Sequence, residues 1–150
     1  MERNKLIWRK ATATDQDAIR ALVKEVDINP LGIKWQRFLL AVNDKDQLVG
    51  CGQIKPHKDG SFELASIAVR RGWRNQGIAK TIINNLLADA TPPLWLTCRQ
   101  ELTVFYEPFG FREITDLSEM PPYFKRVARM FRLFQWISRL DMKLAVMVWR

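Results

Sequence analysis

Two glycines and a Lys-Thr pair have almost the spacing of a phosphate-binding loop. Gly72 and Gly77 are separated by four residues, as in a nucleotide P-loop, but Lys80 and Thr81 come two residues too late. A P-loop needs its Lys directly after the second glycine, so that the ammonium reaches the outer phosphates and the neighbouring hydroxyl holds magnesium. The chain contains no G-x-G-x-x-G, since its one G-x-G, Gly50-Cys51-Gly52, has Lys55 where the third glycine is needed, so the dinucleotide-binding fingerprint is excluded as well.

The same stretch fits a third kind of anion site. An apolar strand precedes it, and a helix with Ile78, Ile82 and Ile83 on one face follows it. Backbone N–H groups at the start of a helix lack partners and bind anions, helped by the helix dipole. A glycine at this position, Gly77, lets a bulky group approach the backbone closely. These residues indicate a pyrophosphate site, and a purely structural turn is the alternative.

The surrounding pattern predicts one mixed α/β domain over residues 1–150. Strands are expected at residues 6–9, 37–43, 48–55, 62–69, 94–98, 111–115 and 143–150. Helices are expected after a capping box at Thr14 and Asp17, and at residues 31–35, 78–87, 102–109 and 123–140. A chain of 150 residues is long enough for one core, and no repeat or flexible linker divides it.

Composition excludes several other classes of protein. The hydrophobic fraction of 47% is that of a globular chain, and no apolar run has the length of a membrane span. The start "MERNKLIW" lacks a signal-peptide pattern, which predicts a cytoplasmic protein without a transmembrane segment. Cys51, Cys98 and His57 have no metal-ligand spacing, so no metal is expected. Both cysteines are interpreted as small buried hydrophobes.

The segment RNQGIA, residues 74–79, resembles the R/Q-x-x-G-x-G/A signature of the GNAT acetyltransferase superfamily, whose members bind acetyl-coenzyme A. The segment FYEPFGF, residues 105–111, resembles the second signature of that family, an aromatic-Tyr pair followed by a Gly-Phe turn. The order of elements from about residue 5 to residue 115 is similar too. The resemblance implies the GNAT fold, an α/β architecture with a central, mostly antiparallel sheet of six or seven strands flanked by helices.

The resemblance also implies where acetyl-CoA binds. In the family, the backbone that corresponds to Ile67, Ala68 and Val69 bonds the pantetheine arm as an added strand. The loop that follows cradles the pyrophosphate, and here it consists of Arg74, Asn75, Gln76, Gly77, Ile78, Ala79 and Lys80. One departure concerns an Asn that contacts pantetheine in many relatives, since this chain has Cys98-Arg99-Gln100 at that place.

Two residues are the candidates for catalysis. Tyr106 matches the usual proton donor of the family to the departing thiolate, although its helical spacing with Leu102, Phe105 and Phe109 also allows a core position. Glu63 lies six residues before Val69, at a distance where some family members carry a catalytic glutamate; the alternative is a solvated strand carboxylate. Weaker candidates for the base are Glu101 and Glu107, interpreted as exposed, and His57 as a proton relay beside a turn.

The implied activity is an N-acetyltransferase that uses acetyl-CoA as co-substrate, with direct attack of a primary amine of a small molecule or protein. Two alternatives stay open at this point. One is an acyltransferase with another acyl-CoA or another acceptor. The other is a non-catalytic CoA-binding interaction module. The sequence names neither the acceptor nor the oligomeric state, and a homodimer is compatible with it.

A basic amphipathic helix at residues 123–140 is the least family-like part, an insertion of residues from about 121 to 140. Residues 121–150 contain seven Lys or Arg and one Asp, a net charge of +6 out of +8. The apolar side of the helix is expected to contain Tyr123, Phe124, Val127, Met130, Phe131, Phe134 and Ile137, and the basic side Lys125, Arg129, Arg132 and Arg139. Leu133, Trp136 and Leu140 fall outside the apolar arc and leave apolar surface for a partner. The helix could cap the core, shape the acceptor site, or contact an anionic partner, a membrane, nucleic acid or a second copy.

Overall fold

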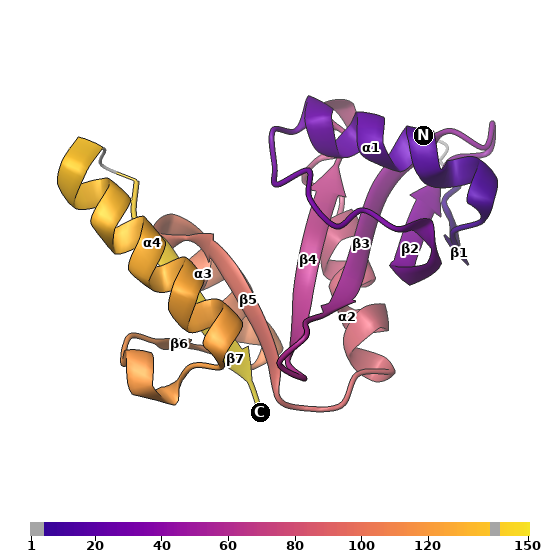
Figure 1. Cartoon of the computed structure of the whole chain (residues 1–150). Coiled ribbons are helices and arrows are strands. Elements are labelled where there is room, and N and C mark those ends of the chain that lie inside the picture. The colour runs from indigo at the N-terminus through magenta and orange to yellow at the C-terminus, as the bar shows by residue number, and fades with distance from the viewer. Residues whose placement is uncertain (1–4, 139–141) are drawn as a thin grey trace. The chain divides into compact units, whose positions relative to one another are not determined.

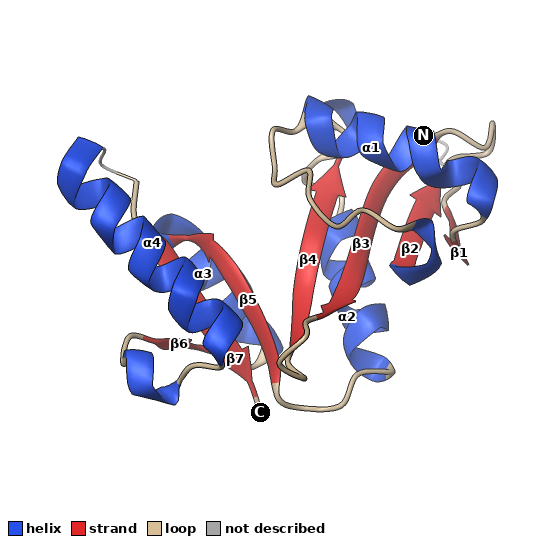
Figure 2. Ribbon diagram, viewed as in Figure 1, coloured by secondary structure: helices blue, strands red, loops and turns tan. Residues whose placement is uncertain are grey.

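A computed structural model describes residues 5–138 and 142–150 of the chain. In these ranges seven strands follow the order β1-β2-β3-β4-β5-β7-β6 (Figure 1). The strands are β1 (Ile7–Lys10), β2 (Phe38–Val42), β3 (Leu48–Pro56), β4 (Phe62–Val69), β5 (Leu94–Arg99), β6 (Phe111–Ile114) and β7 (Leu144–Trp149). The α-helices, blue in Figure 2, are α1 (Gln16–Glu25), α2 (Ile78–Ala88), α3 (Thr103–Tyr106) and α4 (Pro122–Ser138). The pairs β1–β2, β2–β3, β5–β7 and β6–β7 are antiparallel and β4–β5 is parallel, so the predicted mostly antiparallel sheet is confirmed.

The chain forms two compact units. Unit 1 consists of Met1–Lys55 and Leu64–Ala90, and unit 2 consists of Pro56–Glu63 and Thr91–Arg150. The boundary between them therefore passes through β4, which contributes its first residues to unit 2 and the rest to unit 1. The expectation of a single domain stays a prediction.

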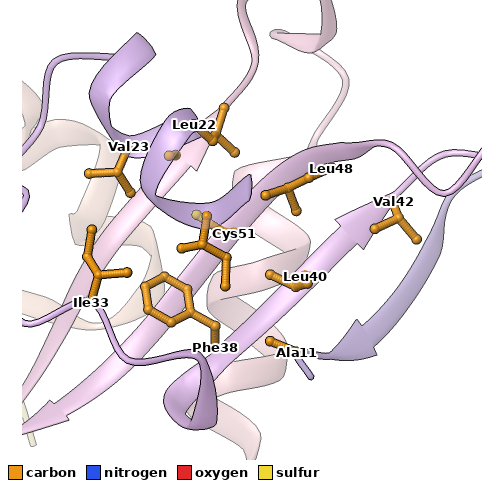
Figure 3. Packing of buried hydrophobic residues seen from close by; sticks show 11 residues of the cluster. Ala11, Leu22, Val23, Ile33, Phe38, Leu40, Val42, Leu48 and Cys51 are labelled. Atoms are coloured by element: carbon orange, nitrogen blue, oxygen red, sulfur yellow. The ribbon is translucent and has the colours of Figure 1, made fainter. Parts of the chain in front are cut away.

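In unit 1 the strands carry a helix on each face. On one face, Ile19, Leu22 and Val23 of α1 belong to a buried cluster with residues of β2 and β3 (Figure 3). The strand residues in it include Phe38, Leu40, Val42 and Cys51. Ala41, which lies between Leu40 and Val42, belongs to a second cluster with Ile78 and Ile82 of α2. Because neighbouring strand residues point to opposite faces, α1 and α2 cover opposite faces of these strands.

The glycines of β3 allow α2 to approach the sheet closely. A Cβ atom at Gly50 would lie 2.7 Å from the Cγ2 of Ile78, and one at Gly52 would lie 2.7 Å from the Cγ2 of Ile82. Both separations are shorter than carbon atoms tolerate without a shift of the helix. The G-C-G of β3 thus sets the distance to the helix that begins at the candidate cofactor loop.

Unit 2 is built on the antiparallel strands β5, β7 and β6. Trp95, Val146 and Val148 form a buried cluster with Phe124 and Ala128 of α4. The rings of Trp95 and Phe124 stack with their centroids 5.6 Å apart. The first turns of α4 are thereby fixed to the strands of this unit.

Two expected helix starts are wrong. The cap before α1 forms at Thr12 and Asp15 rather than at Thr14 and Asp17, because the Thr12 N–H donates to the Asp15 carboxylate at 2.7 Å. Arg9 pairs with the same carboxylate at 2.7 Å and fixes it there. No α-helix forms at residues 31–35, where Gly32 takes a left-handed conformation with φ +68° that interrupts helical geometry, and only a 3₁₀ turn, Trp35–Arg37, begins at the end of that range.

The predicted helix at residues 102–109 is divided into short pieces. A 3₁₀ turn at Gln100–Leu102 precedes α3, and a second one at Glu107–Phe109 follows it. Proline at position 108 lacks the N–H that a continuing α-helix needs, and Gly110, with φ +103°, ends the segment.

The side of α4 that packs on the strands is narrower than expected. Phe124 and Ala128 are buried, and Phe131 and Gln135 are half-buried. These four residues follow one another at spacings of four, three and four, so they form one stripe along the helix. Three residues assigned to the apolar side, Met130, Phe134 and Ile137, are exposed instead. For these three residues the alternative in which the apolar side caps the core is wrong, because the contact surface of a helix on a sheet covers one stripe only.

Four of the residues with an expectation from the sequence lie in or after the last turns of α4. Arg139 and Leu140 lie outside the described residues. Leu133 and Trp136 are exposed, as expected for residues outside the apolar arc. Among the described helices, none combines the length and the apolar character that a membrane span requires.

Candidate active site

The loop between β4 and α2 presents its backbone to the outside. Asn75 and Gly77 adopt the left-handed conformation, with φ values of +64° and +77°. Gly77 is the N-cap of α2, and a Cβ atom placed on it would meet no atom within 4 Å. Residues 74–77 are all exposed. The loop therefore leaves open space in front of its backbone, as an anion cradle requires.

The N–H groups of this loop have no partner among the residues that the structure describes. The first hydrogen bond at the start of α2 runs from the Thr81 N–H to the Gly77 oxygen at 3.0 Å, and the Thr81 hydroxyl donates to the same oxygen at 2.9 Å. Within the described residues, no N–H group from Asn75 to Lys80 donates to a protein acceptor. Such a row of donors at the positive end of a helix fits a diphosphate. Lys80 is exposed, and its ammonium makes no hydrogen bond or ion pair in the described part of the chain.

The strand before the loop contains an unusual backbone position. Ser66 in β4 has φ +57°, a left-handed conformation that costs a residue other than glycine about 1–3 kcal/mol. Two buried side chains of β3 hold it in place: the Gln53 amide donates to the Ser66 hydroxyl at 2.9 Å, and the Cys51 thiol contacts the Ser66 oxygen at 3.5 Å. Residues 67–69, the expected pantetheine partners, follow directly. The sequence did not indicate Ser66, because serine has no preference that marks a left-handed position inside a strand.

Glu63 is buried and paired. Its side chain is 9% exposed, and its Oε1 lies 2.8 Å from the Nε2 of His57, whose side chain is 10% exposed. The β3–β4 turn brings the two residues together, since the His57 N–H donates to the Ser61 oxygen at 2.9 Å. The alternative of a solvated strand carboxylate is therefore wrong. A buried carboxylate next to an imidazole is an arrangement suited to proton transfer.

Tyr123, at the start of α4, covers the His57 ring. The two rings stack with centroids 3.6 Å apart and planes 18° from parallel, while Phe124 meets His57 edge-on at 5.6 Å. The Tyr123 N–H donates to the Asp59 carboxylate at 2.9 Å, which ties α4 to the β3–β4 turn. Burial, and then the charge of Glu63, raises the pKa of Tyr123. This contact was not predictable from the sequence, in which Tyr123 is recognisable only as part of the apolar side of a helix.

Tyr106 lies at the end of α3 and is half-buried. Its ring packs edge-on against Phe105 at 5.0 Å and Phe111 at 6.0 Å. Burial, and then the neighbouring Cys98 thiol, raises the pKa of Tyr106, so the phenol keeps its proton at neutral pH. Of the residues that share its helical spacing, Leu102 and Phe105 are 43% and 39% exposed and only Phe109 is half-buried, so they do not form a closed core.

The burial of the two weaker glutamate candidates for the base and of the two cysteines is as expected. Glu101 and Glu107 are exposed. Cys51 and Cys98 are free and buried. Burial raises the pKa of Cys51 to about 12, and burial together with Glu113 and Glu101 raises the pKa of Cys98 to about 11. Thiols with such pKa values stay protonated and are poor nucleophiles. In residues 5–138 and 142–150, no group of three or more His, Cys, Asp or Glu side chains is arranged to hold a metal ion.

The candidate residues fall into two groups. Unit 1 contains the expected cofactor-binding residues 67–69 and 74–80, while unit 2 contains Glu63, His57, Tyr123 and Tyr106. Within unit 2 the structure brings Glu63, His57 and Tyr123 into contact. The first group can bind an anionic cofactor through its backbone. In the second group Glu63, His57 and Tyr106 can exchange protons, and the Tyr123 ring covers His57.

The family of the chain follows from a match to a family model. The model of the acetyltransferase (GNAT) domain matches residues 34–113, more than half of the chain. The chain therefore belongs to the GNAT acetyltransferase family. No curated protein sequence matches it.

Solved structures share its fold. N-acetylglutamate synthase from Neisseria gonorrhoeae, complexed with coenzyme A and N-acetyl-glutamate, has a TM-score of 0.75 and 15% identity over 99% of this chain. The chain covers 36% of that protein, so it spans little more than a third of its length. Rv2747 from Mycobacterium tuberculosis, in complex with CoA and NLQ, has a TM-score of 0.71 and 21% identity, and the match covers 95% of this chain and 98% of that one. Escherichia coli ElaA has a TM-score of 0.69 and 15% identity, with coverage of 97% and 100%.

At these identities the likeness shows the fold alone. An acyl-CoA N-acyltransferase from Pseudomonas aeruginosa matches as well, with a TM-score of 0.67 over 99% of this chain and 100% of that one. The predicted acyl-CoA N-acyltransferase fold is therefore confirmed.

Proposed function

We propose that the protein transfers the acetyl group of acetyl-CoA to a primary amine. The observation that carries this proposal is the row of unpartnered N–H groups from Asn75 to Lys80, in a chain that belongs to the GNAT family. Coenzyme A contains a pyrophosphate, and these donors fit one. Residues 67–69 would bond the pantetheine arm as an added strand, and Arg74 would add positive charge beside the phosphates.

The reaction needs no covalent enzyme intermediate. The amine nitrogen attacks the carbonyl carbon of the thioester, the C–S bond breaks, and coenzyme A leaves as a thiolate. The thiolate takes the proton of the Tyr106 hydroxyl, and the proton lost by the amine goes to the pair of Glu63 and His57. Backbone N–H groups that follow Ser66 in β4 would stabilise the negative charge on the carbonyl oxygen. Positioning of the two substrates supplies the rest of the acceleration.

A base is needed because an amine attacks only when it is neutral. A lysine side chain with a pKa of ~10.4 is neutral about once in 2,500 molecules at pH 7, a cost of roughly 4.6 kcal/mol. An α-amino group with a pKa of ~7.7 costs only about 1 kcal/mol. The burial of Glu63 beside His57 supports its role as the base, and His57 would stabilise and relay the proton that Glu63 accepts.

The activity is tested by offering acetyl-CoA together with a panel of amines. The panel contains glutamate, other α-amino acids, a lysine-containing peptide and a diamine; glutamate is included because the Neisseria structure contains N-acetyl-glutamate. Release of free thiol is followed over time, and the acetylated product is identified by mass spectrometry. Product from at least one amine supports the proposal. Binding of acetyl-CoA without any acetylated amine would instead favour a CoA-binding interaction module.

A further inference from the structure

The last turns of α4 expose a concentrated apolar surface, which we call the apolar patch of α4. It consists of Met130, Leu133, Phe134, Trp136 and Ile137. Trp136 is 81% exposed, and the other four side chains are between 55% and 67% exposed. Single exposed apolar residues are ordinary on a protein surface, but five large ones within eight positions of one helix indicate a surface that contacts something else.

The strands of unit 2 cannot cover this patch. The side of α4 that packs on them is the stripe from Phe124 to Gln135 described above. Leu133 is two residues from both Phe131 and Gln135, which places it about 160° around the helix from that stripe. The patch therefore faces away from the strands on which α4 packs, and it needs a partner from outside this unit.

The same outward face is positively charged towards the start of the helix. Leu133 comes seven residues after Arg126 and four after Arg129, so all three share one face. Both arginines are exposed. The whole helix, Pro122–Ser138, contains Lys125, Arg126, Arg129 and Arg132 and no Asp or Glu. The guanidinium of Arg132 donates to the backbone oxygen of Thr115 at 2.7 Å and so binds within the chain. The outward arginines that could contact a partner are therefore Arg126 and Arg129.

We propose that this face of α4 docks on an anionic lipid bilayer. The apolar patch would enter the boundary between headgroups and acyl chains, and Arg126 and Arg129 would contact anionic headgroups. Helices that combine Trp, Phe and Leu with Arg and lack acidic residues bind such surfaces by apolar burial and charge attraction. The separation of apolar residues at one end from arginines at the other predicts a tilted helix whose C-terminal end lies deeper.

Other partners fit this face less well. A second copy would bring together two chains of net charge +8, with no acidic residue in either α4 to pair with the arginines. A protein groove that surrounds an amphipathic helix would also need the stripe of Phe124 and Ala128, which already packs on strands. A bilayer needs one exposed face only, and α4 offers one.

The proposal is tested by co-sedimentation with lipid vesicles. The full chain is mixed with vesicles of phosphatidylcholine plus phosphatidylglycerol and, separately, with vesicles of phosphatidylcholine alone. We expect binding to the anionic vesicles, at least about tenfold weaker binding to the neutral ones, and loss of binding at high salt. Equal binding to both vesicles, or none to either, overturns the proposal.

Variants locate the surface. The pair Trp136→Ser and Ile137→Ser removes apolar contacts, and the pair Arg126→Gln and Arg129→Gln removes charge; each is expected to weaken anionic-vesicle binding about tenfold or more. Val104→Ser is the matched control, because Val104 is 69% exposed on α3 and lies outside the patch. Circular dichroism checks that each variant is folded. If light scattering shows a dimer that the Trp136→Ser, Ile137→Ser pair dissociates, the face is an interface between copies and the lipid proposal is overturned.

Discussion

The loop after β4 offers backbone groups for binding, whereas the cluster around Glu63 offers side-chain groups. Residues 75–80 are largely exposed and offer backbone N–H groups that have no partner within residues 5–138 and 142–150. Glu63 and His57 are buried and bonded to each other, with Tyr123 stacked over the imidazole. A site made of backbone depends on φ and ψ and tolerates most changes of side chain. A site made of buried side chains depends on each functional group. Substitution of a side chain should therefore have a large effect in the cluster around Glu63 and a small one in the loop, except where it changes the backbone conformation.

Glu63→Gln should have the largest effect. The amide keeps the size of the side chain and can still bond His57, but it cannot accept the proton of the amine. We expect kcat to fall about 10²–10⁴-fold with the affinity for acetyl-CoA unchanged. Steady-state kinetics with the best amine of the panel measures this. Glu101→Gln is the control, because Glu101 is exposed and should be silent; a Glu63→Gln enzyme with normal kcat would remove Glu63 from the mechanism.

Tyr106→Phe should reduce kcat about 10²-fold, because the departing thiolate loses its proton donor. Tyr123→Phe keeps the ring stacked on His57 and removes only a hydroxyl, so it serves as the matched control and should retain most activity. Since burial raises the pKa of Tyr106, its donor form persists above pH 10, and the pH–rate profile should show no loss from tyrosine ionisation below that pH. If both Phe variants were equally active, Tyr106 would be a packing residue only.

Gly77→Ala should weaken acetyl-CoA binding about tenfold. A Cβ atom meets no neighbour at this position, but a residue other than glycine in the left-handed region costs about 1–2 kcal/mol, and relief of that strain would move the donors. Gly72→Ala is the control, since Gly72 also has open space around its Cβ and lacks a positive φ. Calorimetric titration of both variants measures the difference. Equal affinities would mean that the conformation of Gly77 does not shape the site.

Lys80→Gln should have the smallest effect, a change in acetyl-CoA affinity of less than about threefold. An exposed lysine contributes a screened charge near the phosphates, worth at most about 1 kcal/mol, whereas the Lys80 N–H is unchanged by the substitution. The same titration, at low and at high salt, provides the measurement. A loss of 10²-fold or more would show that Lys80 acts as a P-loop lysine does, through its ammonium group.

The sequence predicted the strands and the loop because local patterns determine them. The mostly apolar run FELASIAV located β4 at residues 62–69, and the glycine at position 77 located the start of α2. The left-handed conformation at Ser66 was not predictable, because Gln53 and Cys51 on the neighbouring strand hold it. Tertiary contacts of this kind leave no mark in the local sequence.

The cluster around Glu63 could be predicted only in part. The spacing from Val69 singled out Glu63, but the burial of that carboxylate depends on the β3–β4 turn and on α4. Tyr123 reaches His57 from 66 positions further along the chain, in a segment beyond the residues that the family model matches. The helical wheel of α4 found apolar residues but could not tell which stripe the strands cover, so the exposure of Phe134 and Ile137 was missed.

Titration of acetyl-CoA and of ATP into the wild-type protein and into Glu63→Gln tests the central claim most directly. If the loop binds the cofactor and Glu63 serves the chemistry, both proteins bind acetyl-CoA with the same affinity, neither binds ATP comparably, and only the wild type acetylates an amine. Binding of ATP in preference to acetyl-CoA, or loss of acetyl-CoA binding on substitution of Glu63, would contradict the account.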